Sequence, residues 1–256
     1  MRATMRARLA AGVEEKKARL EGLRPLAPGA LHNLERAFDL ELTYTSNALE
    51  GNTLTQIETN LVIEQGVTVG GKKLKDHLEA VDHHEALAYV RALAGRGSKL
   101  TEYDLRSLHA LVLRRSDPAI AGGYATVGRY VNTDLGRHTF PSPAQVPALM
   151  GDFAHWLGDA PASPQTAFAA HRRLVDIHPF NDGNGRTARL LMNLVLIRGG
   201  YPPVAVRLED RLRYLRALQE AQAGRGDGDF LDLLFERLDA ALDAYLSALG
   251  EALPPP

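Results

Sequence analysis

Residues 178–189 hold most of the side chains in this sequence that could do chemistry, and they read His-Pro-Phe-Asn-Asp-Gly-Asn-Gly-Arg-Thr-Ala-Arg. His178 can accept a proton, and Asp182 supplies a carboxylate. Arg186 and Arg189 are three residues apart, so on a helix they share a face and can grip one extended polyanion. Asp182 would repel a phosphate, which indicates that a hard cation such as Mg²⁺ bridges carboxylate and phosphate oxygens there.

The surrounding residues predict a loop that leads into the N-terminus of a helix. Gly183 and Gly185 let the backbone curl so that successive N–H groups point inward, and an apolar, helix-favouring run follows at 190–197. Free N–H groups and the helix dipole favour an anion at such an end. The ordinary pKa of histidine, about 6.5, leaves His178 mostly neutral near pH 7. We therefore predict a site for the phosphate chain of a nucleotide.

Each of these residues also has an ordinary interpretation. A single histidine is by default structural or exposed, and two arginines three apart are usually a solvated helix face. His178 and Asp182 have the spacing of a metal pair on a helix, but Pro179 argues against a helix there. The occurrence of all these features together, in this order, favours the nucleotide site.

The segment resembles the motif of the Fic family, His-x-Phe-x-(Asp/Glu)-Gly-Asn-Gly-Arg-x-x-Arg, and matches every fixed position. Fic proteins mostly transfer AMP from ATP to a hydroxyl side chain of a target protein and release pyrophosphate. The resemblance implies that His178 is the general base for a target Ser, Thr or Tyr. It implies that Asp182 holds Mg²⁺ and that Arg186 and Arg189 neutralise the β- and γ-phosphates. The implied anion hole consists of Gly183, Asn184 and Gly185.

A second segment, Ser-Asn-Ala-Leu-Glu-Gly-Asn at 46–52, matches the inhibitory pattern (Ser/Thr)-x-x-x-Glu-(Gly/Asn) of many Fic proteins. Because this pattern precedes the catalytic motif, the chain resembles the class with an N-terminal inhibitory helix. In this sequence the inhibitory pattern begins at Ser46. By that resemblance, Glu50 pairs with Arg189 and takes space that the γ-phosphate of ATP needs. A carboxylate is a fair mimic of phosphate oxygens for a guanidinium. Glu50 could also simply end a helix before Gly51, and both interpretations can hold.

Two further parts of the site are expected from the resemblance. The stretch 130–143 lies where relatives carry a β-hairpin flap that pairs with the target peptide, although an ordinary surface loop is the alternative. The residues expected to dock the target are Arg137, His138, Thr139 and Phe140. Tyr214 stands where relatives place an aromatic residue against adenine, and Gln222 stands where an asparagine is usual.

The expected activity is that of an autoinhibited protein adenylyltransferase that uses ATP and Mg²⁺ on an unidentified target protein. Removal of AMP from a modified target, with Glu50 orienting a water, is the enzymatic alternative. A non-catalytic nucleotide-binding regulator is the third, and the intact His178 speaks against it. The interpretation of the chain as a DNA-binding regulator has still less support. Gly185 favours nucleotidyl transfer over the phosphoryl transfer of the death-on-curing branch, which lacks this glycine.

Apolar residues recur at helical spacing along most of the chain, which predicts an all-α, Fic-type helical bundle with a small hairpin flap. We expect an N-terminal helical arm at 1–39, a Fic domain including the inhibitory helix at 40–249, and a disordered tail at 250–256. The expected helices are 31–42, 77–93, 103–113, 146–156, 166–177, 190–197, 211–221 and 230–249.

Composition limits the function more than it defines it. With 30 basic against 31 acidic residues, the net charge of −1 gives no electrostatic case for nucleic acid as a partner. The chain has no cysteine, so nothing demands an oxidising compartment. No apolar run approaches the ~20 residues of a membrane helix. The expectation is a cytoplasmic protein without membrane contact, and a homodimer is expected by the resemblance.

Overall fold

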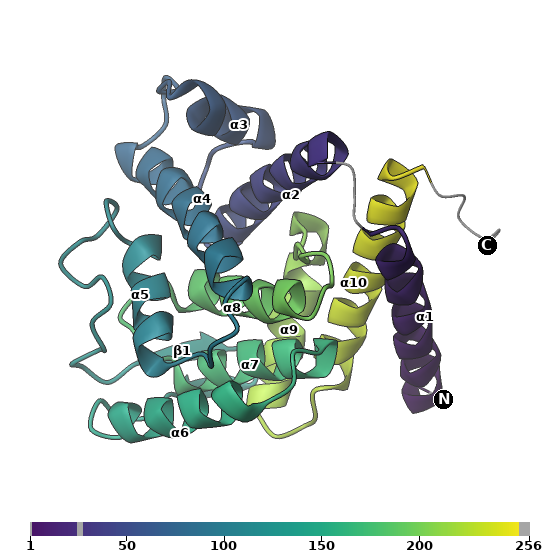
Figure 1. The fold of residues 1–256 in the computed structure, drawn as a ribbon. Helices are drawn as coiled ribbons and strands as arrows, with labels where there is room; N and C mark the ends of the chain where they lie inside the picture. Colours follow the sequence, from purple (N-terminus) through teal and green to yellow (C-terminus); the bar gives the residue numbers. More distant parts are fainter. Residues whose placement is uncertain (1, 25–27, 251–256) are drawn as a thin grey trace.

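The computed structural model describes residues 2–24 and 28–250, which form a helical bundle with one small hairpin (Figure 1). The all-α prediction with a hairpin is confirmed. In chain order the elements are α1 (Arg2–Gly22), α2 (Pro28–Leu49), α3 (Gln56–Gln65), α4 (Leu74–Ala94), α5 (Glu102–Val112), β1 (Tyr130–Thr133), β2 (Gly136–Thr139), α6 (Val146–Asp159), α7 (Pro164–Ile177), α8 (Asn184–Arg198), the 3₁₀ turn η1 (Leu208–Asp210), α9 (Arg211–Gln222) and α10 (Gly228–Ala248).

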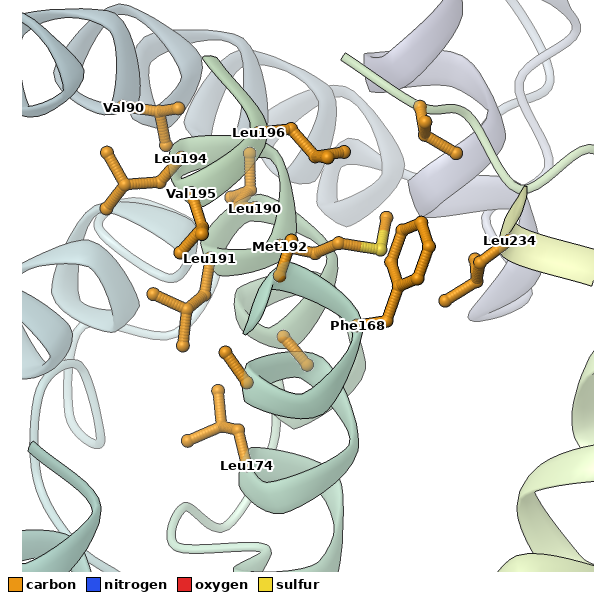
Figure 2. Close-up of a cluster of buried hydrophobic side chains, with 14 of the residues drawn as sticks. Val90, Phe168, Leu174, Leu190, Leu191, Met192, Leu194, Val195, Leu196 and Leu234 are labelled. Atoms are coloured by element: carbon orange, nitrogen blue, oxygen red, sulfur yellow. The ribbon is translucent and has the colours of Figure 1, made fainter. Parts of the chain in front are cut away.

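Helix α8 is the centre of the bundle, because its side chains are buried on every face from Arg186 to Leu196. Figure 2 shows this directly: Leu190, Leu191 and Met192 point away from α8 in different directions into one apolar cluster. A helix that is apolar all round is stable only when other elements surround it. Here α4, α5 and α7 pack against it. The helix that carries both motif arginines is therefore held rigidly.

Helix α7 delivers the chain to α8 through a short loop. Ser163 caps its N-terminus by accepting a hydrogen bond from the Thr166 N–H, and Pro164 starts the helix. At its C-terminus His178 takes the left-handed conformation, with φ 49°, and is the only non-glycine residue with positive φ in the described chain. Such conformations are sparsely populated and are concentrated at functional sites. Gly183, with φ 76°, is the N-cap residue directly before α8.

Helix α2 lies across α4 and brings residues 46–50 to the centre of the molecule. Arg91 of α4 holds α2 with bonds of 2.7 Å to Asp39 and 2.9 Å to Glu35. After α2 ends, Gly51 turns the chain with φ 95°, and Thr55 caps α3 in a capping box. The expected boundary between residues 39 and 40 therefore falls inside one continuous helix.

Helix α1 packs along α10, although the sequence suggested only an arm at this end (Figure 1). Val13 and Leu20 are seven residues apart, so they share one helix face, and both are buried. Arg6 bonds Asp232 at 2.6 Å, and Lys16 lies 2.7 Å from Asp239. The sequence predicted a helical arm here but not its packing on α10, because the apolar stripe of this charged helix is narrow. The expected tail at 250–256 lies outside the described residues from 251 onward.

The hairpin pairs β1 with β2 in antiparallel register, with Tyr130 opposite Thr139 and Thr133 opposite Gly136. Gly136 adopts φ 109°, which the tight turn requires. Most residues of the hairpin are exposed.

In the described part of the chain, no helix is long and apolar enough to span a bilayer.

Candidate functional site

The loop between α7 and α8 is tied together by Asn184. Its side-chain oxygen accepts a bond from the Phe180 N–H at 3.0 Å, and its amide donates to the Phe180 carbonyl at 2.8 Å. Both bonds are buried, so they replace water that the loop backbone would otherwise need. The Asn184 side chain therefore shapes the loop, and only its backbone N–H remains for an anion.

Phe180 anchors the loop through a partner on another helix. It is fully buried and stacks on His109 of α5, with ring centroids 3.6 Å apart. His109 Nδ1 accepts a bond from the Gly122 N–H at 2.9 Å, so Nε2 carries the proton and donates to the Asp182 carbonyl at 2.9 Å. Burial lowers the pKa of His109 to about 4 and keeps this arrangement in place near pH 7. A lone histidine on a helix gives no sequence signal for such a contact.

His178 lies under the hairpin, where its ring stacks on Phe140 with centroids 3.9 Å apart. Burial lowers its pKa to about 4, with Arg129 adding to the fall and Val175 and Glu50 opposing it. The imidazole is therefore neutral across the physiological range. A neutral imidazole at the edge of an anion-binding helix end can accept a proton from a hydroxyl group.

Arg189 is paired with Glu50, as the sequence predicted. Its Nη2 donates to Glu50 Oε1 at 2.8 Å and to the Ser46 carbonyl at 2.9 Å. Its Nε donates to Ser46 Oγ at 3.0 Å. Burial by itself would lower the pKa of Arg189, but Glu50 and Tyr214 together offset this and the pKa is raised. Ser46, in the last turn of α2, and Glu50, the residue directly after this helix, thus hold the guanidinium together.

The Glu50 carboxylate also lies against the first turn of α8. Gly185 has no side chain, and a Cβ added there would overlap Glu50 Oε1. The first N–H groups of a helix have no partner inside it and attract an anion. In this structure the anion at that position is the carboxylate of Glu50, beside Arg189. Gly185 is required because only a glycine leaves room for it.

Arg186 has a carboxylate partner of its own. Its side chain is almost fully buried, and Nη1 lies 3.2 Å from Glu79 Oε1 of α4. Glu79 Oε2 accepts a bond from Asn52 at 3.0 Å, so it joins the motif to the turn that follows Glu50. Arg186 Nε and Nη1 have no partner with hydrogen-bond geometry. Such donors suit an incoming anion, because buried polar groups otherwise remain unsatisfied.

Asp182 is the residue expected to hold a metal ion. Its side chain is 47% exposed, and Oδ2 lies 3.5 Å from Arg186 and 3.8 Å from Lys75. No group of three or more potential metal ligands occurs in the part of the chain that the structure describes. Mg²⁺ typically uses one or two carboxylates together with water and substrate phosphates. The single carboxylate therefore fits a cation that is bound jointly with a nucleotide.

Tyr214 does not line an open base pocket, where the sequence placed it. It is buried, and its hydroxyl lies 2.8 Å from His171 Nε2. The helical phase of α9 turns this ring inward, so it cannot stack on a base in this conformation. Gln222, the last residue of α9, is partly exposed.

The hairpin carries the four residues expected to dock a target. Arg137, His138 and Thr139 are in β2, and Phe140 follows directly. The Phe140 N–H bonds the Arg129 carbonyl at 3.1 Å, which closes the base of the hairpin beside His178. Arg137 lies over the ring of Tyr130, 4.3 Å from its centroid. The expected flap therefore borders the expected base.

Comparisons with known proteins agree with this arrangement. The family model described as Fic/DOC family matches residues 99–196. Proteins named protein adenylyltransferase Fic are similar: that of Nematostella vectensis is 39% identical over 80% of this chain and 48% of its own, and that of Drosophila grimshawi is 34% identical over 97% and 51%. This chain thus spans about half the length of these curated relatives.

Two solved structures share the fold over nearly the whole chain. A Fic domain-containing signalling protein from Bacteroides thetaiotaomicron is 33% identical, with a TM-score of 0.85 over 96% of this chain and 99% of its own. Fic-1 from C. elegans is 30% identical, with a TM-score of 0.84 over 96% and 72%.

Proposed function

This chain belongs to the Fic/DOC family, and from that premise we propose that it is a protein adenylyltransferase restrained by its own Glu50. The substrates are ATP and a hydroxyl side chain of a target protein, and the products are the AMP-modified protein and pyrophosphate. The names of the similar adenylyltransferases support this activity.

One observation carries the proposal: a neutral histidine, an anion-binding helix end and the carboxylate of Glu50 meet at one place. Glu50 lies on the first turn of α8 and on Arg189, where phosphate oxygens would bind. His178 is close enough for Glu50 to affect its pKa. A carboxylate that occupies a phosphate position competes with the phosphate for the same donors.

The transfer follows from these positions. The target hydroxyl oxygen attacks the α-phosphorus of ATP, and its proton passes to the neutral imidazole of His178. The bond from the α-phosphorus to the bridging oxygen breaks, and pyrophosphate leaves with that electron pair. The backbone N–H groups at the start of α8 stabilise the charge that develops on the phosphate oxygens. Arg186 and Arg189 hold the departing phosphates.

Asp182 would hold Mg²⁺ beside these phosphates. The cation would neutralise phosphate charge when it is bound. Asp182 suits this role because its carboxylate is half exposed and the backbone of its loop is fixed by His109. The exposed hairpin offers unpaired strand edges beside His178, where an extended target segment could add by main-chain pairing.

The identity of the transferred group tests the proposal. Glu50→Gly protein is incubated with Mg²⁺ and with ATP that carries its label on either the α- or the γ-phosphate. Label should enter protein from the α-position only, and His178→Ala in the same background should remove it. Transfer from the γ-position would instead show a kinase. Absence of transfer from both would exclude adenylyl transfer to this chain itself and to added candidate targets.

A second candidate is removal of AMP from a modified target. It is favoured by the position of Glu50, whose side chain is 42% exposed and close enough to His178 to raise its pKa. A carboxylate there can orient a water toward a phosphodiester. Wild-type protein would then release AMP from a protein that the Glu50→Gly variant has modified. Retention of the label after incubation with wild-type protein would contradict this candidate.

A further inference from the structure

His109, in the last turn of α5, bonds the backbone of two other segments of the chain. Its Nδ1 accepts a hydrogen bond from the Gly122 N–H, and its Nε2 donates to the Asp182 carbonyl, each at 2.9 Å. Arg106, one turn earlier on α5, donates to the Gly122 carbonyl at 2.9 Å, so α5 holds Gly122 by both its N–H and its C=O. The His109 ring also stacks flat on Phe180. The imidazole therefore has one tautomer and one orientation, and it presents a fixed donor to Asp182.

The bond from His109 sets the plane of the peptide that joins Asp182 to Gly183. In a trans peptide the C=O and the N–H point in opposite directions, so a carbonyl held toward α5 directs the Gly183 N–H away from it. That N–H donates to Oδ1 of the Asp182 carboxylate at 2.6 Å. His109 Nε2 lies only 3.3 Å from the place of a Cβ on Gly183, so the peptide is closely covered on this side. One peptide thus links the imidazole to the carboxylate.

The carboxylate of Asp182 keeps its second oxygen for a ligand. Oδ1 is used by the Gly183 N–H, whereas Oδ2 lies 3.5 Å from Arg186 and 3.8 Å from Lys75. A half-exposed aspartate would otherwise turn about its last torsion, which has broad minima. The bond at Oδ1 restricts this rotation, and that bond depends on the peptide that His109 holds. The direction of the exposed oxygen is therefore set from the buried side of the loop.

We propose that His109 is a positioning residue that orients the Asp182 carboxylate, through the peptide between residues 182 and 183, toward a cation bound with ATP. This inference rests on the proposed function, because that function assigns Asp182 to Mg²⁺. His109 itself contacts neither the cation nor the nucleotide. Removing a partner that orients a metal ligand typically costs about 10- to 100-fold in metal affinity. A residue that only stabilised the loop would weaken the binding of ATP with and without Mg²⁺ alike.

The test is calorimetric binding of ATP to Glu50→Gly protein, once with Mg²⁺ and once with a chelator in its place. The quantity compared is the gain in ATP affinity that Mg²⁺ gives. His109→Phe keeps a flat ring against Phe180 but loses both hydrogen bonds, so it should reduce this gain about tenfold and change metal-free binding by less than about twofold. His109→Gln keeps a donor for the Asp182 carbonyl and should lie closer to the parent protein than to His109→Phe.

Two controls separate positioning from a general loss of structure. In an Asp182→Ala background, His109→Phe should change the gain no further, because His109 acts through that carboxylate. His77→Phe removes a buried histidine of α4 that also bonds two backbone groups, the Val69 N–H and the Lys73 carbonyl, both at 2.8 Å, and it should leave the gain unchanged. An unchanged gain in His109→Phe, or equal weakening of ATP with and without Mg²⁺, would overturn the inference.

Amide hydrogen exchange tests the same contact without any nucleotide. With Glu50 in place, the Gly183 N–H should exchange about tenfold faster in His109→Phe than in wild type, as for the loss of one buried hydrogen bond, and His77→Phe should leave its rate unchanged. If Glu50→Gly protein binds no ATP, the proposed function fails, whereas this exchange rate still decides whether His109 holds the peptide. Equal exchange in His109→Phe and wild type contradicts the inference.

Discussion

Loop 178–184 and hairpin β1–β2 both border His178, but they are built in opposite ways. The loop is buried and cross-bonded through Asn184, His109 and Phe180. The hairpin is mostly exposed and is joined to the core mainly at its base, through Phe140. The side assigned to phosphate chemistry is therefore fixed by many contacts, and the side assigned to the target is left open. This difference suits a site that binds the same kind of nucleotide in every reaction, while the protein substrate must enter and leave.

The largest effect is expected at the residue where the two regions meet. In the Glu50→Gly background, His178→Ala should lower the rate of transfer by about 10²- to 10⁴-fold, because proton acceptance by a general base contributes that much. Calorimetric ATP binding should stay within about twofold. His155→Ala, at an exposed histidine of α6, is the control for both measurements. Loss of ATP binding together with transfer would make His178 a structural residue.

The second prediction compares an asparagine in each region. Asn184→Ala removes two buried hydrogen bonds and leaves backbone groups of Phe180 unsatisfied, so it should cost about 2 kcal/mol of unfolding free energy. Asn132→Ala, in the exposed strand β1, should stay within about 0.5 kcal/mol. Urea unfolding measures both. Equal costs would show that the loop is no more firmly held than the hairpin.

Buried histidines should make the fold sensitive to acid. Burial lowers the pKa of His109 and His178 to about 4 and that of His171 to about 3. In the unfolded chain each has a pKa of about 6.5 and binds a proton first. Stability from these groups is thus complete above pH 6.5 and falls as pH drops toward 4 or 3, by up to about 1.4 kcal/mol per pH unit for each.

Urea unfolding between pH 7 and 5 measures this slope. His171→Leu should flatten it, while His155→Ala, at a side chain that is 85% exposed, should leave it unchanged. That result would assign the acid sensitivity of the unfolding free energy to the buried side of the site and not to the exposed hairpin. A slope that is the same in all three proteins would assign the acid sensitivity to other groups.

The smallest effect concerns how the hairpin covers the base. Phe140 stacks on His178, so Phe140→Ala should let water reach the imidazole and raise its pKa from about 4 toward 6.5. Tyr130→Ala, at a residue that is 57% exposed, is the matched control and should leave that pKa unchanged. An NMR titration of the His178 ring protons measures both. An unchanged value in Phe140→Ala would mean that other elements desolvate His178.

Contacts close in sequence or carried by a motif were predictable, and contacts between distant helices were not. The loop into α8 follows from glycines and an apolar run, and the Glu50–Arg189 pair follows from a resemblance that links residues 139 positions apart. His109 and Glu79 contribute through packing of α5 and α4 on α8, which periodicity does not reveal. Tyr214 shows the same limit, because the residue type was noticed while the direction of its side chain depends on how α9 is rotated.

The account depends most on the claim that Glu50 occupies the place of a phosphate at the start of α8. The direct measurement is the rate of label transfer from α-labelled ATP in wild type, Glu50→Gly and Glu50→Ala. Glu41→Ala is the matched control, since Glu41 lies in α2, the helix that ends just before Glu50, and pairs with Arg207 instead. Removing Glu50 should raise the rate at least tenfold, and Glu41→Ala should leave it at the wild-type level. A rate that is equal to or below wild type in both Glu50 variants would contradict the account.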